Sequence, residues 1–228
     1  MIAAGVIVAA GRGERFGASG KILAHVAGRP MLAWSLDAFD QCDAIRDIVI
    51  VAGLHTIDDV QFLLEIGRWT SAISIVEGGS DRSKSVLHGV EALASDVDVA
   101  VIHDAARPLL TIDQIALSAD IAWREGAAIV ATPVTDTLKR VDGSLRIAET
   151  VDRTAIWAAQ TPQAFRRSDL LDAYSEASDR DVTDEAMLFE RLGKPVRIIP
   201  GSRENMKVTV PEDLAFADFL MRARLEPH

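Results

Sequence analysis

The chain has 228 residues, of which 49% are hydrophobic, and this is enough for one sizeable core in a single domain. Its 34 acidic and 24 basic side chains give a net charge of −10, and such a surface repels the phosphates of nucleic acids and anionic lipids. We therefore expect no nucleic-acid and no membrane partner. A small anionic substrate is not excluded, because a few local cations can outweigh a distant global charge.

Cysteine and histidine usage limits the metal chemistry of the chain. Cys42 is the only cysteine, which excludes an intrachain disulfide and a cysteine zinc site, and the five histidines lack the spacing of a metal-binding pair. No apolar run reaches the roughly 20 residues needed to cross a bilayer. The N-terminus also lacks the pattern of a secretory signal, so the sequence predicts a cytoplasmic protein.

Short apolar runs alternate with amphipathic segments along the chain, a pattern typical of an α/β fold in which helices cover both faces of a mostly parallel sheet. The apolar runs predict strands at residues 6–9, 47–52, 72–76, 97–103 and 127–131. Helices are predicted at residues 30–39, 82–94 and 111–124. The third helix opens with a capping-box pair, Thr111 and Gln114.

The pattern changes after Pro133, where Asp142-Gly143 between two strand-like flanks predicts a β-hairpin. Such a hairpin can form an arm that projects from the sheet edge and packs on a second subunit, although a surface hairpin without a partner is an equally good interpretation. We expect one domain spanning residues 1–228, with a dimerisation arm at about 137–160. Helices at 168–177 and 183–192, a strand at 196–199 and a last helix from Pro211 complete the predicted elements.

The first predicted strand leads into a loop of small residues, Ala9-Ala-Gly-Arg-Gly-Glu-Arg-Phe-Gly17. Small residues let backbone N–H groups approach a ligand closely and form a concavity that favours phosphate. The dinucleotide fingerprint would need glycine at Phe16, and the Walker loop would need Ser or Thr at Ile22. A tight turn with solvated basic residues is the weaker alternative, since clustered cations repel one another without an anion. The cations in question are Arg12, Arg15 and Lys21.

This loop, together with Lys21 and Gly28-Arg-Pro-Met-Leu, resembles the start of the sugar-phosphate nucleotidyltransferases. Seven later segments narrow the resemblance to the 2-C-methyl-D-erythritol 4-phosphate cytidylyltransferase family over essentially the whole chain. These segments are GGSDRSKSVLHG from Gly78, HDAARP from His103, PVTDTLK from Pro133, TVDR from Thr150, QTPQ from Gln160, TDEA from Thr183 and MKVT from Met206.

The resemblance implies a Rossmann-like nucleotidyltransferase fold with a protruding β-hairpin arm. It implies transfer of CMP from CTP to 2-C-methyl-D-erythritol 4-phosphate in the non-mevalonate isoprenoid pathway, with Mg²⁺ or another divalent cation bound with CTP and the chain acting as a homodimer. A ribitol 5-phosphate cytidylyltransferase is the nearest alternative, against which the pair Ala105-Ala106 argues. A non-catalytic CTP-binding domain is the other alternative.

The resemblance also assigns roles to individual residues. The implied catalytic residues are Arg15, Lys21, Arg153 and Lys207, with Arg153 reaching the 4-phosphate from the arm of a partner subunit. The implied nucleotide-binding residues are Ala9, Ala10, Gly11, Arg12, Gly13, Gly78, Gly79, Ser85 and Ala105. The implied substrate-binding residues are Asp104, Arg107, Thr137, Thr161 and Thr183. Asp104 is also a candidate metal ligand, and Thr183 a candidate helix cap.

Overall fold

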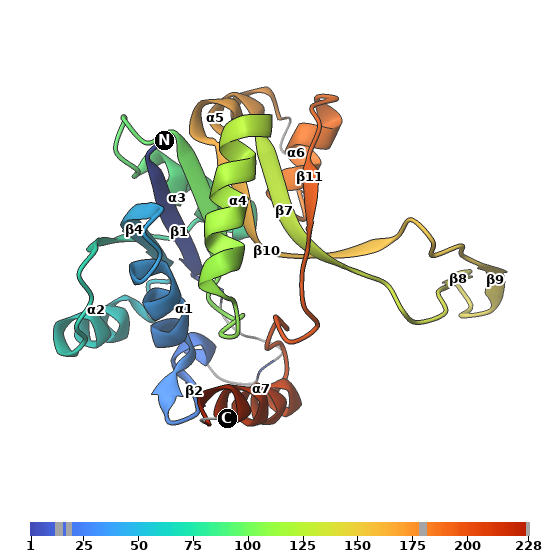
Figure 1. Ribbon diagram of the computed structural model, residues 1–228. Helices are drawn as coiled ribbons and strands as arrows, with labels where there is room; N and C mark the ends of the chain where they lie inside the picture. The colour runs from blue at the N-terminus through green and yellow to red at the C-terminus, as the bar shows by residue number, and fades with distance from the viewer. Residues whose placement is uncertain (12–15, 17–19, 178–181, 227–228) are drawn as a thin grey trace.

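A seven-stranded sheet forms the centre of the computed structural model, which describes residues 1–11, 16, 20–177 and 182–226 (Figure 1). The strand order is β11-β7-β10-β6-β1-β4-β5. Among these strands only β10 runs antiparallel to its neighbours, β6 and β7. The strands of this sheet are β1 (Ala3–Ala9), β4 (Ile45–Ala52), β5 (Ala72–Glu77), β6 (Val99–Asp104), β7 (Ala127–Pro133), β10 (Trp157–Arg166) and β11 (Arg197–Pro200).

Helices cover both faces of the sheet, as the sequence pattern predicts. One core cluster joins α1, α2 and α4 to the sheet, and a second joins α3, α5 and α6 to its other face. The helices are α1 (Met31–Asp40), α2 (Ile57–Ile66), α3 (Arg82–Glu91), α4 (Ile112–Glu125), α5 (Arg167–Glu176), α6 (Glu185–Arg191) and α7 (Pro211–Leu225). None of the helices in the described part of the chain is long and apolar enough to span a membrane.

Strand β1 shows why the apolar runs become buried parallel strands. Ala3 and Ile7 point into the cluster with α1, whereas Ala4 and Val6 point into the cluster with α3. Because side chains alternate across a strand, a strand covered on both faces is apolar at every position. Because β1 runs parallel to both β4 and β6, the carboxyl ends of the three strands meet at one edge of the sheet, where α/β proteins bind their ligands.

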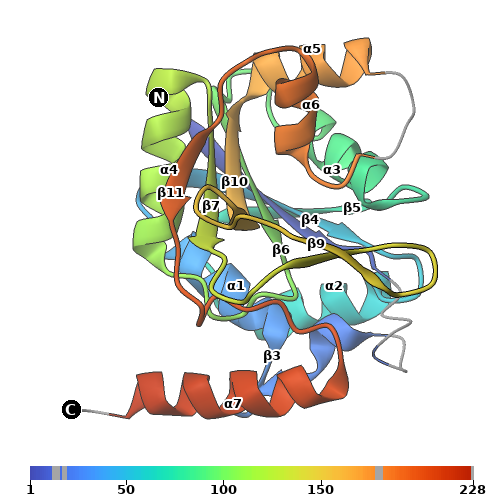
Figure 2. The same ribbon diagram turned by 90° about the vertical axis from the view of Figure 1, so that its right-hand side faces the viewer.

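Helix α7 packs on a separate small core below the sheet (Figure 2). Its Ala217 and Met221 are buried with Val26, Leu109 and Val208. Val26 belongs to a small hairpin of β2 (His25–Val26) and β3 (Arg29–Pro30), which follows the 3-10 turn η2 (Lys21–Leu23). Helix α7, near the end of the chain, thus packs against the segment that follows the glycine loop near its start.

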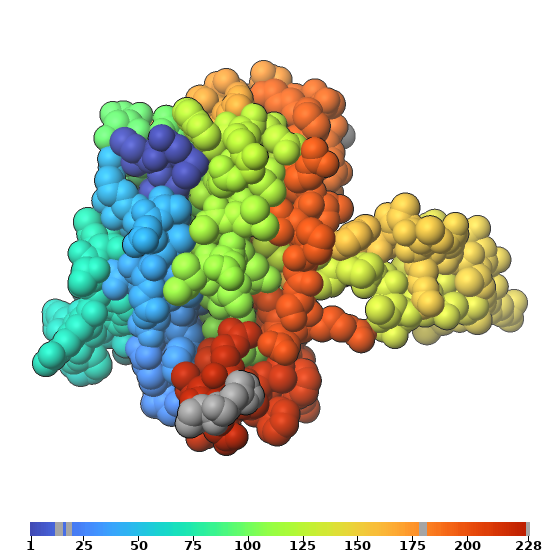
Figure 3. Space-filling model, viewed as in Figure 1, coloured from blue at the N-terminus to red at the C-terminus, as the bar shows by residue number. Residues whose placement is uncertain are grey.

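The predicted hairpin is confirmed, and the segment that carries it, residues 134–156, is here called the arm. The arm extends away from the rest of the molecule and holds β8 (Lys139–Val141) and β9 (Ile147–Thr150), which pair antiparallel (Figures 1 and 3). At the turn, the Asp142 carboxylate accepts bonds from Ser144 and from the backbone N–H of Arg146. The arm leaves from β7 and β10, which are interior strands, so the expectation that it projects from the sheet edge is wrong.

Three further expectations need correction. The range 137–160 expected for the arm runs into β10, where Trp157 pairs with Pro133 of β7. Neither β10 nor α2 was expected from the sequence. Strand β10 mixes polar and apolar residues, so it does not form an apolar run. The N-cap of α6 is Asp184, whose carboxylate accepts the backbone N–H of Met187, and not Thr183.

Candidate active site

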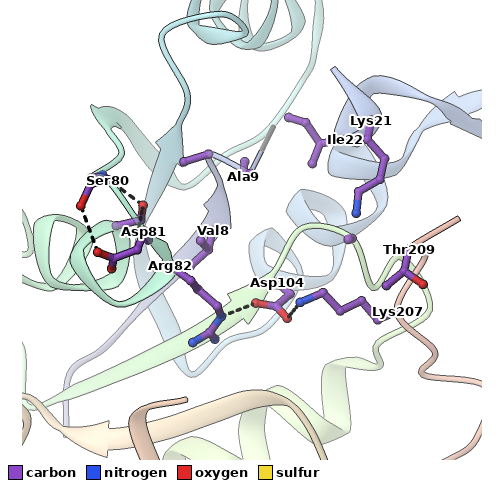
Figure 4. Close-up of a pocket in the computed structure, with 15 residues that line it drawn as sticks. Val8, Ala9, Lys21, Ile22, Ser80, Asp81, Arg82, Asp104, Lys207 and Thr209 are labelled. Carbon is purple, nitrogen blue, oxygen red and sulfur yellow. Dashed lines mark hydrogen bonds and ion pairs between the residues drawn. The ribbon is translucent and has the colours of Figure 1, made fainter. Parts of the chain in front are cut away.

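A pocket of about 770 Å³ opens at the carboxyl ends of β1 and β6 (Figure 4). Its lining comes from five parts of the chain that are distant in sequence but meet at this edge of the sheet. The lining residues are Val8, Ala9, Ala10, Gly11, Lys21, Ile22, Gly79, Ser80, Asp81, Arg82, Ser85, Asp104, Ala106, Lys207 and Thr209.

The glycine turn before α3 forms one wall of the pocket. The Ser85 hydroxyl accepts the backbone N–H of Gly79 at 3.0 Å and donates to the carbonyl of Asp81 at 2.7 Å, which ties the turn to the first turn of the helix. A Cβ atom on Gly78 would lie 2.3 Å from the Cβ of Ala10. Glycine is thus required here for the turn after β5 to approach the end of β1, and the small residues leave backbone groups accessible to a ligand.

Asp104 is the central carboxylate of the pocket and ends β6. Arg82 Nε lies 3.1 Å from Asp104 Oδ1, and Lys207 Nζ lies 2.7 Å from Asp104 Oδ2 (Figure 4). Burial by itself would raise the pKa of Asp104, but the charges of Arg82 and Lys207 and the hydrogen bond from Lys207 hold it well below its usual value. Asp104 therefore stays ionised and balances part of the positive charge.

Arg82 connects the pocket to a buried acid. Its guanidinium donates to both oxygens of Glu185, at 3.0 and 2.9 Å, and the Glu185 side chain is fully buried at the start of α6. Tyr174 of α5 donates its hydroxyl to Glu185 at 3.2 Å. Burial raises the pKa of Glu185, and the charge of Arg82 opposes that rise. Arg82 is thus held between two carboxylates, one of them in the pocket.

A chain of hydrogen bonds behind Asp104 fixes its backbone. The Asp104 N–H donates to Thr161 Oγ1 at 3.1 Å, and Thr161 Oγ1 lies 2.9 Å from His103 Nδ1. His103 Nε2 lies 3.1 Å from the carbonyl of Arg107, which can only accept a bond. Burial lowers the pKa of His103 to about 3. His103 is therefore a neutral imidazole with its proton on Nε2, and Thr161 donates to its Nδ1.

The two lysines of the pocket are linked by a short stretch near the end of the chain. Lys21 Nζ donates to the carbonyl of Val208 at 2.9 Å, next to Lys207 in sequence. Val208 is buried, and its N–H donates to the carbonyl of Ala106 at 2.8 Å. Two ammonium groups from opposite ends of the chain thus enter the same pocket. This arrangement suits a ligand with several negative charges.

The structure brings together many of the residues that the sequence singled out. Those that line the pocket are Ala9, Ala10, Gly11, Lys21, Gly79, Ser85, Asp104 and Lys207. Gly78 and Ala105 lie directly beside this lining. Thr161 accepts the backbone N–H of Asp104, and Arg107 donates to the backbone carbonyl of Asn205, so both hold residues at or next to the pocket. Arg12, Gly13 and Arg15 lie outside the described residues.

The other predicted residues that the structure describes, Thr137, Arg153 and Thr183, do not line this pocket. Thr137 and Arg153 are exposed on the arm, where the Arg153 guanidinium donates to the carbonyl of Thr135. Thr183 is exposed next to the start of α6.

Sequence reasoning did not assign a site role to Arg82. Its partners stand 22 and 103 positions away, and no spacing rule connects residues that far apart. The one local signal is its place directly after Asp81, which caps α3 by accepting the backbone N–H of Lys84.

The carboxylates of the pocket limit how a metal ion could be held. Within the described part of the chain, no three His, Cys, Asp or Glu side chains are grouped to hold one. Asp104 is engaged by cations on both oxygens, so it is at most one ligand. A hard cation such as Mg²⁺ is often held by one or two carboxylates together with phosphate oxygens of a substrate, and this donor set fits that arrangement.

Comparison with known proteins agrees with the resemblance seen in the sequence. Residues 3–223 match the family model of 2-C-methyl-D-erythritol 4-phosphate cytidylyltransferase. The enzyme of that name from Prochlorococcus marinus is 42% identical over 96% of this chain and 98% of its own length. The enzyme from Geobacillus thermodenitrificans is 40% identical over 96% of this chain and 97% of its own length.

The fold agrees as well. The crystal structure of 4-diphosphocytidyl-2C-methyl-D-erythritol synthase from Anaerococcus prevotii superposes with a TM-score of 0.84 at 30% identity, over 97% of this chain and 98% of the other. The chain belongs to the 2-C-methyl-D-erythritol 4-phosphate cytidylyltransferase family.

Proposed function

We propose that this protein transfers CMP from CTP to 2-C-methyl-D-erythritol 4-phosphate, releasing pyrophosphate and 4-diphosphocytidyl-2-C-methyl-D-erythritol. The observation that carries the proposal is the convergence of Lys21, Arg82 and Lys207 on one pocket at the end of β1 and β6, in a chain of this family. Small residues next to these cations let a triphosphate approach the backbone.

The reaction is a phosphoryl transfer between two anions. A 4-phosphate oxygen attacks the α-phosphorus of CTP in line, and the bond from that phosphorus to the α–β bridging oxygen breaks with pyrophosphate as the leaving group. A phosphate dianion needs no general base near neutral pH. The main cost is to bring negative groups together, so preorganised cations lower the barrier, typically by ~3–4 kcal/mol for each group.

The residues of the pocket divide this work. Lys21 and Arg15 are the candidates to stabilise the α-phosphate, and Lys207 is the candidate to hold the 4-phosphate. Lys207 is supported in this role by its contact with Asp104, which fixes the ammonium group and can accept bonds from hydroxyls of the acceptor. A divalent cation such as Mg²⁺, bound with CTP, would supply further neutralisation of phosphate charge, and Asp104 is the candidate side chain to hold it.

The arm supports a homodimer as the active form. It exposes Val141, Leu145 and Ile147, with 47%, 83% and 64% of these residues accessible, and a two-stranded hairpin gains little stability alone. We propose that a second copy covers this surface and that Arg153 of the partner subunit completes the site. The buried, free Cys42 suits a reducing compartment, which supports a location in the cytoplasm.

The direct test is pyrophosphate release from CTP and Mg²⁺ with each candidate acceptor. We expect turnover with 2-C-methyl-D-erythritol 4-phosphate and little or none with ribitol 5-phosphate. Turnover with ribitol 5-phosphate alone would reverse the assignment of the acceptor. Binding of CTP by calorimetry without turnover of either acceptor would instead favour a non-catalytic CTP-binding domain.

A further inference from the structure

The segment from residue 205 to residue 210, here called the strap, holds both lysines of the pocket. Lys207 belongs to the strap and donates to Asp104 at 2.7 Å. The next residue, Val208, accepts the Lys21 ammonium on its carbonyl at 2.9 Å. A shift of the strap would therefore move both ammonium groups at once.

One carboxylate of α7 fixes the pocket side of the strap. Asp213 Oδ2 accepts the N–H of Thr209 at 2.7 Å, the hydroxyl of Thr209 at 2.7 Å and the N–H of Val210 at 3.0 Å. Burial alone would raise the pKa of Asp213, but these bonds and the nearby charge of Lys21 lower it. The carboxylate is thus a charged acceptor at neutral pH, and charge-assisted bonds of this kind are the stronger ones.

These contacts exceed what a helix start needs. Asp213 stands in the first turn of α7, where accepting the N–H of Val210 satisfies one donor at the end of the helix. The two bonds to Thr209 lie outside the helix, and Thr209 lines the pocket together with both lysines (Figure 4). The buried side chains of Ala217 and Met221 hold helix α7 against the small core, and this fixes the position of Asp213 in its first turn.

We propose that Asp213 is a positioning residue for the transfer reaction, which holds the strap so that Lys21 and Lys207 occupy the places that the two phosphates require. It acts through Thr209 and Val210 and has no contact with the substrates. This inference rests on the proposed function, because it assigns Asp213 to the same pair of cations.

The test compares Asp213→Ala with a matched control on the same helix. Asp218 also accepts a backbone N–H, that of Ala27 at 2.7 Å, and pairs with Arg222, but it does not line the pocket. We expect Asp213→Ala to lower kcat for CMP transfer by up to about a hundredfold, the scale of a misplacement near 1 Å. Asp218→Ala should keep kcat near that of the unchanged protein, with both variants assayed below their measured Tm.

A double-mutant cycle separates positioning from a general loss of stability. If Asp213 acts through the lysines, Asp213→Ala should reduce kcat much less in a Lys21→Ala background than in the unchanged protein. Equal losses in both backgrounds, or equal kcat for Asp213→Ala and Asp218→Ala, would overturn the proposal. An unchanged protein that releases no pyrophosphate would instead overturn the proposed function.

Two conservative variants keep the test decisive if Asp213→Ala does not fold. Asp213→Asn keeps the size of the side chain and one acceptor oxygen, so it should retain most of kcat. Asp213→Glu keeps the charge but is one methylene longer, so it should displace the strap and lower kcat. The opposite order, with Glu active and Asn impaired, would show that charge and not the geometry of the strap matters, and would overturn the proposal.

Discussion

At the scale of single residues, neighbouring groups in this site have opposite protonation behaviour. Asp104 stays charged because Arg82 and Lys207 contact it, whereas the adjacent His103 stays neutral because it is fully buried. Glu185 tolerates complete burial because the Arg82 guanidinium donates to both of its oxygens. These contacts fix the charges that line the pocket, with Glu185 and His103 outside the lining, and two predictions follow from them.

Removal of Glu185 should destabilise the fold strongly. In Glu185→Ala, Arg82 keeps Asp104 but loses its buried partner, and breaking a buried pair in this way typically costs about 3–5 kcal/mol of unfolding free energy. Urea unfolding measures the loss. Asp96→Ala is the matched control, because it removes the partner of Arg46 in a solvent-screened surface pair, and such pairs contribute little to stability. Similar losses in the two variants would show that burial of the pair is unimportant.

The neutral His103 should make the fold less stable in acid. The pKa of a histidine is about 6.5 in an unfolded chain and about 3 here, so between these values the unfolded state binds a proton that the folded state does not. The free energy of unfolding should then fall as pH falls, by about 2 kcal/mol from pH 7 to pH 5 from this residue.

Urea unfolding at both pH values, in buffer with a chelator, measures this effect. His103→Gln removes the contribution of His103 to the pH dependence. The variant should therefore lose less free energy of unfolding than the unchanged protein between pH 7 and pH 5. An identical pH dependence in both proteins would contradict a neutral, buried His103.

At the scale of elements, close contacts between helices and the sheet bring the pocket walls together. Gly89 of α3 lies directly against β1 and β4: an added Cβ would be 2.4 Å from Val6 Cγ1 and 2.7 Å from Val51 Cγ2. Gly5 of β1 faces the ring of Phe39 of α1 in the same way, at 2.5 Å. Glycine on either side of β1 therefore lets two helices sit close to the strand that leads into the glycine loop.

Gly89→Ala should destabilise the protein even though alanine favours a helix. Overpacking of a tight core typically costs about 1–3 kcal/mol of stability. Replacing glycine by alanine in a helix gains only about 1 kcal/mol, so the overpacking cost should dominate. Thermal unfolding should show a lower Tm, and Val6→Ala in the same chain should restore part of it. Gly143→Ala is the control, because an added Cβ there meets nothing within 4 Å. A Tm for Gly89→Ala at or above that of this control would contradict the close contact.

At the scale of the whole molecule, the net charge of −10 and an anionic substrate are compatible. Three cations, Lys21, Arg82 and Lys207, line the pocket with two carboxylates, Asp81 and Asp104, whereas acidic residues outnumber basic ones over the whole chain. The charge therefore argues against a long polyanion lying across the surface, but not against a compact nucleotide in a locally positive pocket. The arm adds a second feature at this scale, because it extends away from the rest of the molecule and carries the exposed Arg153 (Figure 3).

If Arg153 acts across a dimer, two inactive variants should complement each other. Mixing Arg153→Ala with Lys207→Ala should give hybrid dimers with one intact site, and about a quarter of the sites should be active in an equal, fully exchanged mixture. Pyrophosphate release before and after mixing measures this recovery. Arg140→Ala is the control on the arm, since Arg140 pairs with Glu149 at 2.6 Å, and it should stay active alone. No recovery after subunit exchange, shown with labelled chains, would contradict the shared site.

Much of the fold could be predicted from local patterns. The buried parallel strands, the capping box of α4 and the hairpin depend on residues close together in sequence, and all three are confirmed. Strand β10 was missed because its residues from Gln160 to Gln163 include polar side chains that are buried in hydrogen bonds. Its antiparallel direction also has no signal in a local window.

The sequence by itself determined the fold class, the glycine loop and the resemblance to a family, since these depend on apolar periodicity and on motifs in fixed order. Only the tertiary structure decided which partners the cations find: the carboxylate of Glu185 for Arg82, across 103 positions, and the backbone carbonyl of Val208 for Lys21, across 187. It also decided that His103 is neutral. The physical reason is that ionic contacts and pKa values depend on distance in space and on burial, and neither can be read from spacing along a chain.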